Sequence, residues 1–303
     1  MFLRQRNLLL QNEVTREEND FYPYRYLAAE GFLPGYNFPA LPLRAWVPRR
    51  IVDGEYISRP RFVALREFVP HNRVYHEGAK WQVSRFQSPP GKLADRCRQL
   101  RICNVCSTFT EVSQDACPTC GTLFSGDNST IFPSLLEMPN VLLKRHEKIT
   151  CNEEERLRGG YAISMAFRFA ENTQLNRITE ARISDRMDLT YAPNADILLI
   201  NHGWRKSERR GFRINLDTGE IVNLNKDGEP STNPSEQSGD WVHPFVQDSR
   251  NLLRLRIRQE SLRQDEEFMT TLMCHWNGGL NIPSSWRTPN WRPTSSAGIR
   301  SKP

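Results

Sequence analysis

Two pairs of cysteines are the side chains whose type and spacing most clearly predict chemistry. Cys103 and Cys106 form one C-x-x-C pair, and Cys117 and Cys120 form a second after ten intervening residues. Each pair folds back as a knuckle, so that two thiolates reach one metal ion at about 2.3 Å, and two knuckles build a tetrahedral site. The spacing therefore predicts Zn²⁺ bound in a zinc ribbon, with disulfides or unliganded thiols as the alternatives.

The residues around the second pair fit a tight metal-binding turn. Pro118 stiffens the backbone inside the pair, and Gly121 can supply the left-handed position that such a turn often needs. Because all four expected ligands are protein thiolates, no coordination position remains for water. The site is therefore expected to fold a segment and to perform no chemistry.

The charges of the chain are unevenly distributed. Residues 1–102 carry 17 Lys and Arg against 10 Asp and Glu, and the remainder after residue 140 carries 24 against 21. Residues 103–140, the ribbon and its exit, contain no Lys or Arg and four acidic residues. A module that binds phosphates needs cations on its surface. We therefore expect the ribbon to stabilise the fold or to serve as a docking surface.

Residues 44–101, which we call the basic stripe, are the candidate nucleic-acid surface. Thirteen Lys and Arg residues face only five acidic residues there, and seven aromatic residues are interleaved. Arginine favours bidentate phosphate contacts, and aromatic rings can stack on unpaired bases. The alternatives are that the aromatics form a strand core beneath solvated arginines, or that the stripe is a protein interface. The contact residues predicted are Arg44, Arg49, Arg50, Arg59, Arg61, Arg66, Trp46 and Trp81.

Several classes of protein have no signature in this sequence. No G-x-x-x-x-G-K-[ST], G-x-G-x-x-G, G-x-S-x-G or kinase motif set is present, so no catalytic centre is recognisable and enzyme activity is left open. No stretch approaches eighteen apolar residues, which argues against a membrane span. Seven cysteines, four of them in knuckle spacing, suit a reducing compartment, so we expect a cytoplasmic protein.

The chain is expected to adopt an α+β, strand-rich fold, with small β-barrel-like pieces around an inserted four-cysteine zinc ribbon. Residues 61–70 are expected to be a strand, and residues 73–86 a hairpin that turns at Glu77-Gly78. Residues 251–258 alternate with period two and place three arginines on one face of a strand. The expected units are a helical arm with a Pro/aromatic loop at 1–50, a basic β subdomain at 51–102, the ribbon at 103–140, a β-rich domain at 141–258, and a helix with a disordered tail at 259–303.

Six motifs along the chain also carry a family likeness. They are GFLPGYNFPALPLR (31–44), ISRPRFVALREFVP (57–70), VYHEGAKWQV (74–83), the two C-x-x-C pairs, ILLINHGWR (197–205) and VHPFVQDSRNLL (242–253).

Together these motifs resemble the region behind the motor of large DEAD/DEAH-box helicases of superfamily 2, of the MrfA type and the DISARM phage-defence type. The resemblance covers about residues 20–258, and its first motif, at residues 31–44, is fairly specific. In that family an ATP-driven motor precedes this region, and a cysteine-bearing domain of unknown function follows the segment at 242–253. The chain lacks the motor and hardly begins the last domain, which implies a fragment or a split protein, so helicase activity is not carried over.

Two functions follow from the residues and the resemblance together. The first is an accessory nucleic-acid-binding and scaffolding region of a superfamily 2 DNA helicase, in DNA repair or phage defence, whose partners are DNA and a motor in cis or in trans. The second is a structural zinc-ribbon module that binds a protein partner and makes no nucleic-acid contact.

Overall fold

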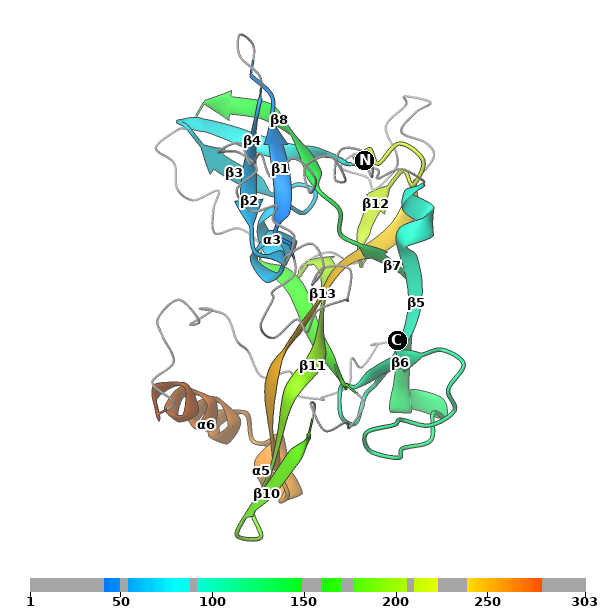
Figure 1. Ribbon diagram of the computed structural model, residues 1–303, viewed down its shortest axis with the longest axis vertical. Helices are drawn as coiled ribbons and strands as arrows, with labels where there is room; N and C mark the ends of the chain where they lie inside the picture. Colours follow the sequence, from blue (N-terminus) through cyan, green and yellow to red (C-terminus); the bar gives the residue numbers. More distant parts are fainter. Residues whose placement is uncertain are drawn as a thin grey trace.

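The computed structural model describes residues 41–49, 54–87, 92–148, 160–170, 177–205, 210–222 and 239–279. Within these ranges the chain is strand-rich and forms two sheets, one above the other in Figure 1. The expected helix after Pro23, most of the Pro/aromatic loop and the expected tail lie outside the described residues. In the described part of the chain, no helix is long and apolar enough to cross a membrane.

The first sheet has five strands in the order β2-β1-β8-β4-β3. Its β1 and β8 are parallel, and its other pairs are antiparallel. Its strands are β1 (Leu43–Val47), β2 (Glu55–Arg59), β3 (Arg73–His76), β4 (Ala79–Phe86) and β8 (Val141–Lys148).

The hairpin of β3 and β4 confirms the prediction for residues 73–86. Val74 pairs with Trp81 and His76 with Ala79, so that Glu77 and Gly78 form a two-residue turn. Both turn residues have positive φ, 46° and 69°. This is the backbone that a type I′ turn requires and that matches the twist of the strands.

The prediction of a strand at residues 61–70 is wrong, because the helix α3 (Arg61–Glu67) occupies this position. Pro60 precedes the first helical residue, and proline is tolerated at a helix start because its missing N–H has no partner there. Ala64, Leu65 and Phe68 are fully buried, and this i, i+1, i+4 spacing is the apolar stripe of a helix packed on one side. Packing against the neighbouring sheets therefore decides between two conformations that the short apolar run allows.

The second sheet has eight strands in the order β10-β11-β13-β7-β5-β6, with β12 also pairing with β13 and β9 also pairing with β11. Its strands are β5 (Cys97–Cys103), β6 (Phe109–Glu111), β7 (Ser129–Glu137), β9 (Tyr161–Phe169), β10 (Thr179–Ile183), β11 (Met187–Trp204), β12 (Phe212–Ile214) and β13 (Asp240–Ile257).

This second sheet bends into a half-barrel. On one side its outer strand is β6, on the other it is β9 beside β11, and the residue before β6 contacts β9. An isolated bridge joins Thr108 to Phe167, and the Phe167 N–H donates to the Ser107 carbonyl at 3.1 Å. The interior holds a separate apolar cluster that includes Phe109 and Phe245, both nearly inaccessible. The segment that carries the four cysteines therefore connects β5 to β7. Its first knuckle also makes the contact with β9 that closes the half-barrel.

The remaining elements are short. Two 3₁₀ turns, at Leu93–Arg96 and Gly126–Asn128, precede β5 and β7. The two helices α5 (Glu260–Gln264) and α6 (Glu266–Gly279) follow β13 at the end of the sheet, in agreement with the helix expected after residue 259.

A hairpin that contains β12 connects the two sheets. The Gly219 carbonyl accepts a hydrogen bond from the Phe86 N–H of β4 at 2.8 Å, and Gly219 has φ +76°. A Cβ at this position would lie 2.1 Å from the Phe86 carbonyl oxygen. Only glycine fits this close approach between backbones.

Candidate metal centre and basic surfaces

The two cysteine pairs come together in one cluster. The Cys103 and Cys120 sulfurs lie 3.7 Å apart, the Cys106 and Cys117 sulfurs 3.4 Å apart, and all four sulfurs lie within 4.8 Å of one another. All four thiols are free, and a disulfide would bring two sulfurs to about 2.05 Å. Four thiolates at about 2.3 Å from one Zn²⁺ would be roughly 3.8 Å apart in a tetrahedron, so the observed separations fit a metal ion.

The backbone of the two knuckles is nearly the same. In the first, the Ser107 N–H donates to the Cys103 carbonyl at 2.8 Å; in the second, the Gly121 N–H donates to the Cys117 carbonyl at 2.9 Å. Ser107 has φ 62° and Gly121 has φ 71°. The left-handed position predicted at Gly121 is thus confirmed, and the first knuckle places a serine where glycine is the favoured residue.

Two threonines belong to the centre although the sequence analysis did not select them. The Thr108 hydroxyl oxygen lies 3.2 Å from the Cys106 sulfur, and the Thr122 hydroxyl oxygen lies 3.1 Å from the Cys120 sulfur. A hydroxyl that donates to a metal-bound thiolate orients that ligand. The signal was present in the sequence, because a threonine follows the last cysteine of each pair by two residues.

Burial affects the ionisation of the thiols in the cluster. Burial raises the pKa of the Cys103 and Cys106 thiols above the ordinary value. Burial acts in the same direction on Cys120, but hydrogen bonds from the side chain and backbone of Thr122, together with those of Cys117 and Cys106, outweigh it and lower the pKa to about 6. A dication at the centre of the cluster would supply the charge that buried thiolates need.

The cysteine cluster contacts the half-barrel on one side and its own loop on the other. Phe124 packs against the cysteines, and the Arg101 guanidinium of β5 lies 5.0 Å from the centre of the Phe124 ring. Arg101 also donates to the Gln114 carbonyl at 2.6 Å, inside the loop between the knuckles. This arginine of the basic stripe therefore supports the ribbon.

Arg49 of the basic stripe is held by carboxylates. Its guanidinium lies 2.6 Å from Glu55 and 2.8 Å from Glu77, and His76 lies 2.7 Å from the same Glu55 carboxylate. The Glu55, His76 and Glu77 ligand atoms lie within 4.8 Å of one another, but Arg49 already provides their positive charge. We therefore assign this group to an ion-pair network.

The other predicted arginines of the stripe fall into two groups. Arg59 pairs with Glu67 at 2.7 Å and Arg61 with Glu137 at 3.7 Å. Among the described residues, Arg44 and Arg66 have no carboxylate within ion-pair distance; Arg44 lies over the Tyr56 ring. Burial and the neighbouring Arg205 lower the pKa of Arg66. Arg50 lies outside the described residues.

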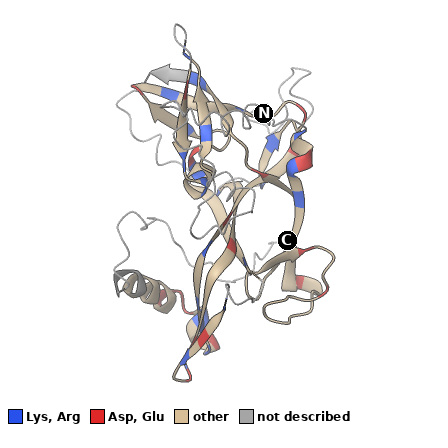
Figure 2. Cartoon of the chain, in the orientation of Figure 1, with Lys and Arg blue, Asp and Glu red and all other residues tan. Residues whose placement is uncertain are grey.

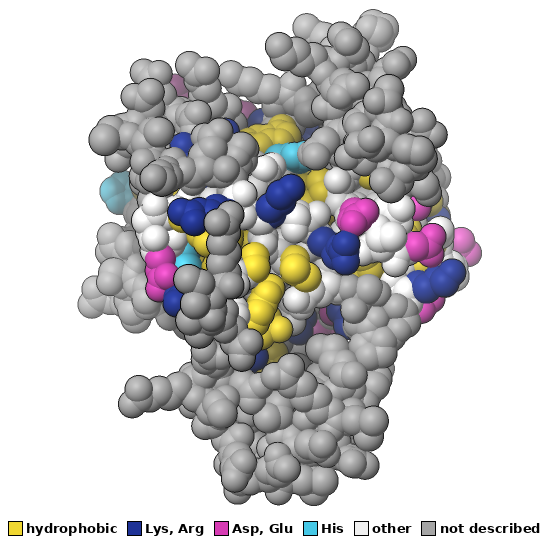
Figure 3. Space-filling model, turned by 90° about the horizontal axis from the view of Figure 1, so that it is seen from above, with side chains coloured by type: hydrophobic (Ala, Val, Ile, Leu, Met, Phe, Trp, Pro, Cys, Tyr) yellow, Lys and Arg dark blue, Asp and Glu magenta, His cyan; other side chains and the backbone are white. Residues whose placement is uncertain are grey.

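The two predicted tryptophans pack within the protein. Trp81 is 8% exposed and its indole N–H donates to the His76 carbonyl at 3.2 Å. Trp46 packs against Tyr56 with the two rings tilted by 59° and their centres 4.7 Å apart. In Figure 3 the basic side chains visible from above lie in separate small groups, with apolar, polar and acidic groups between them. Trp81 is thus a core residue, and the contact role of the stripe stays a prediction.

The comparisons with known proteins give little. No protein-family model matches the chain, and no curated protein matches it. Among solved structures, the crystal structure of the DUF1998 helicase MrfA bound to DNA matches at 10% sequence identity and a TM-score of 0.26 over 76% of this chain. The chain spans 20% of the length of that protein. A similarity at this TM-score carries no argument, so the function is argued from the residues and the geometry.

Proposed function

We propose that the chain is an accessory nucleic-acid-binding and scaffolding region of a superfamily 2 DNA helicase that acts in DNA repair or phage defence. Its ATPase motor would be supplied in cis or in trans. The sequence motifs at 31–44, 57–70 and 197–205 support the helicase assignment. The observation that carries the scaffolding role is the four-cysteine centre, whose first knuckle joins β6 to β9.

A four-thiolate Zn²⁺ in this position would act as a structural clamp. The ligands Cys103, Cys106, Cys117 and Cys120 leave no coordination position open, so the ion would stabilise the half-barrel and take part in no reaction. A cytoplasmic location is part of the proposal, because a reducing compartment keeps the four thiols available to the metal. The proposal also keeps the domain limits expected from the sequence, at residues 1–50, 51–102, 103–140, 141–258 and 259–303.

The nucleic-acid contact is proposed from charge. The chain carries a formal charge of +6, and DNA binding driven by phosphate neutralisation weakens steeply as salt rises. Within the basic stripe, Arg44 and Arg66 are the better candidates, because no carboxylate of the described ranges pairs with them and such a guanidinium has more to gain from a phosphate.

Binding to labelled oligonucleotides at several salt concentrations tests this proposal. We expect measurable affinity for DNA at low salt and a steep linear fall of log K with log salt concentration. Absence of binding to both single-stranded and duplex oligonucleotides at low salt would refute the nucleic-acid role. An upstream reading frame that encodes a phosphate-binding loop would support the split-helicase arrangement.

A protein-interaction module is the second candidate function, and the surface of the ribbon favours it. Leu123 is 68% exposed and Val105 49% exposed, and residues 103–140 contain no Lys or Arg. An exposed apolar surface without cations suits a protein partner better than a phosphate backbone. Copurification of a stable partner that Leu123→Ser removes and that charge reversal at Arg49 and Arg50 leaves intact would favour this function.

A further inference from the structure

Strands β10, β11 and β13 form an arm that extends beyond the half-barrel (Figure 1), and the two faces of this arm differ in chemistry. Across the three strands, Ala181 pairs with Leu189 and Leu189 with Leu255, so that one face is apolar. The residues between them point to the other face. These form two rows, Glu180-Thr190-Arg254 and Arg182-Asp188-Arg256.

The second face, which we call the arginine face, has more guanidinium groups than carboxylates. Asp188 lies 2.9 Å from Arg182 and 3.6 Å from Arg258. The hydrogen bond from Arg182 and the charges of Arg182, Arg258 and Arg256 hold the pKa of Asp188 below its usual value. One carboxylate therefore serves three arginines of this face, and basic and acidic segments lie side by side at the tip of the arm (Figure 2).

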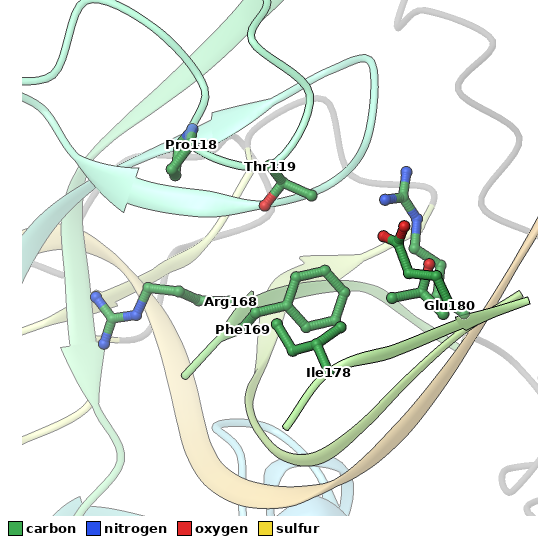
Figure 4. Close-up of a pocket in the computed structure, with 8 residues that line it drawn as sticks. Pro118, Thr119, Arg168, Phe169, Ile178 and Glu180 are labelled. Carbon is green, nitrogen blue, oxygen red and sulfur yellow. The ribbon is translucent and has the colours of Figure 1, made fainter. Parts of the chain in front are cut away.

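The arginine face leads into a hollow beneath the second knuckle. The hollow has a volume of about 270 Å³ and is lined by Arg254, Thr190 and Glu180 of the arm, with Arg168 and Phe169 of β9. Pro118 and Thr119 of the knuckle lie across it from Phe169 and Ile178 (Figure 4).

The arginines at the hollow differ in how they are held. Arg168 pairs with Asp196 at 2.9 Å. Arg254 lies 5.5 Å from the centre of the Phe167 ring, and no carboxylate among the described residues lies within ion-pair distance of it. A phosphate would therefore meet Arg254 without first breaking an ion pair.

We propose that the arginine face and this hollow bind single-stranded nucleic acid, with phosphates on Arg254 and Arg256 and one base against the Phe169 ring. A row of arginines beside an aromatic ring is the arrangement that single-strand binders use, because the cations follow the backbone and the ring stacks on any base. The hollow is smaller than the roughly 300–1,000 Å³ of a drug-sized ligand site, so it suits one base of a longer chain.

This inference rests on the proposed nucleic-acid role and assigns the contact to a surface outside the basic stripe. In the stripe, Arg49 and Arg59 are occupied by glutamates and Trp81 is buried. On the arginine face, the guanidinium groups outnumber their partners, and the aromatic ring borders an open hollow.

The test compares two double variants that remove the same charge. Arg254→Ser with Arg256→Ser alters the arginine face, and Arg49→Ser with Arg59→Ser alters the stripe as a matched control. Loss of two single-strand phosphate contacts reduces the slope of log K against log salt by about 1.4. Between about 50 and about 200 mM salt, the wild-type chain should therefore lose about sevenfold more affinity for a single-stranded oligonucleotide than the arm variant. The stripe variant should keep the wild-type slope.

A third variant tests the base contact. Phe169→Leu keeps an apolar side chain and removes the ring, and we expect single-strand affinity to fall by about fivefold or more, with a smaller change for a duplex of equal length. Circular dichroism and urea unfolding check that each variant is folded.

The outcomes separate this inference from the proposed function. If the wild-type chain binds no oligonucleotide, the proposed function fails and the inference fails with it. If it binds, and the stripe variant loses the salt dependence while the arm variant keeps it, the inference alone is overturned. Two other results would overturn the single-strand assignment. One is that Phe169→Leu binds the single-stranded oligonucleotide as tightly as the wild-type chain. The other is that the wild-type chain prefers duplex and that only the arm variant loses this preference.

Discussion

If the four-cysteine centre binds Zn²⁺ as proposed, removal of the ion should release Phe109 from the half-barrel core. Phe109 begins β6, directly after the first knuckle, and its side chain is 1% exposed. If the knuckle loses its shape without the ion, the bridge between Thr108 and Phe167 and the hydrogen bond from Phe167 to Ser107 are lost with it.

The magnitude follows from the burial of Phe109. In the metal-loaded protein, Phe109→Ala should lower the free energy of unfolding by about 3–5 kcal/mol, the usual cost of removing a buried phenylalanine. In the metal-free protein the ring has already left the core, so the same substitution should cost less than about 1 kcal/mol. The coupling between metal and ring is then about 2–4 kcal/mol.

Urea unfolding of the wild-type and Phe109→Ala proteins, each with and without a zinc chelator, measures this coupling. Phe86→Ala is the matched control, because Phe86 is equally buried but belongs to the core of the five-stranded sheet. It should cost the same with and without metal. An equal cost of Phe109→Ala in both states, or unfolding of the five-stranded sheet on chelation, would refute the local role of the metal.

Three further predictions concern single positions. Ser107→Gly should raise the free energy of unfolding by up to about 1 kcal/mol, because the left-handed backbone strains serine, whereas Gly121→Ala should lower it by about 1 kcal/mol; thermal melts of the two variants should shift in opposite directions. Gly219→Ala should lower it by about 3 kcal/mol, because the added methyl group meets the Phe86 carbonyl oxygen, and a melting temperature equal to wild type would contradict this. Burial, a neighbouring histidine and Arg210 lower the pKa of His202 to about 4. The unfolded chain therefore takes up a proton that the folded chain does not, and stability should fall as the pH drops from about 6.5 to about 4. His202→Asn should flatten this part of the urea-stability profile.

Local patterns in the sequence were sufficient for the four-cysteine cluster and the hairpin. The cysteine spacing predicted four clustered sulfurs, and the Glu77-Gly78 pair predicted the turn, because both depend on residues close together in the chain. The alternation at residues 251–258 likewise predicted that Arg254 and Arg256 share a face of β13, and Arg258 directly follows the strand.

Features that depend on contacts between distant segments could not be predicted from local sequence patterns. Residues 61–67 form a helix because Leu65 and Phe68 are buried by other elements, which no window of ten residues reveals. The bridge between Thr108 and Phe167 joins segments almost sixty residues apart. The glutamates that pair with Arg49 and Arg59 are also set by strand and helix placement, so the charge count of the basic stripe overstated its free cations.

X-ray absorption spectroscopy at the zinc edge on the purified chain tests the central claim most directly. The account predicts one zinc ion per chain, with four sulfur neighbours at about 2.3 Å and no nitrogen or oxygen ligand. A chain that carries no metal after purification under reducing conditions, or a zinc ion with fewer than four sulfur neighbours, would contradict it.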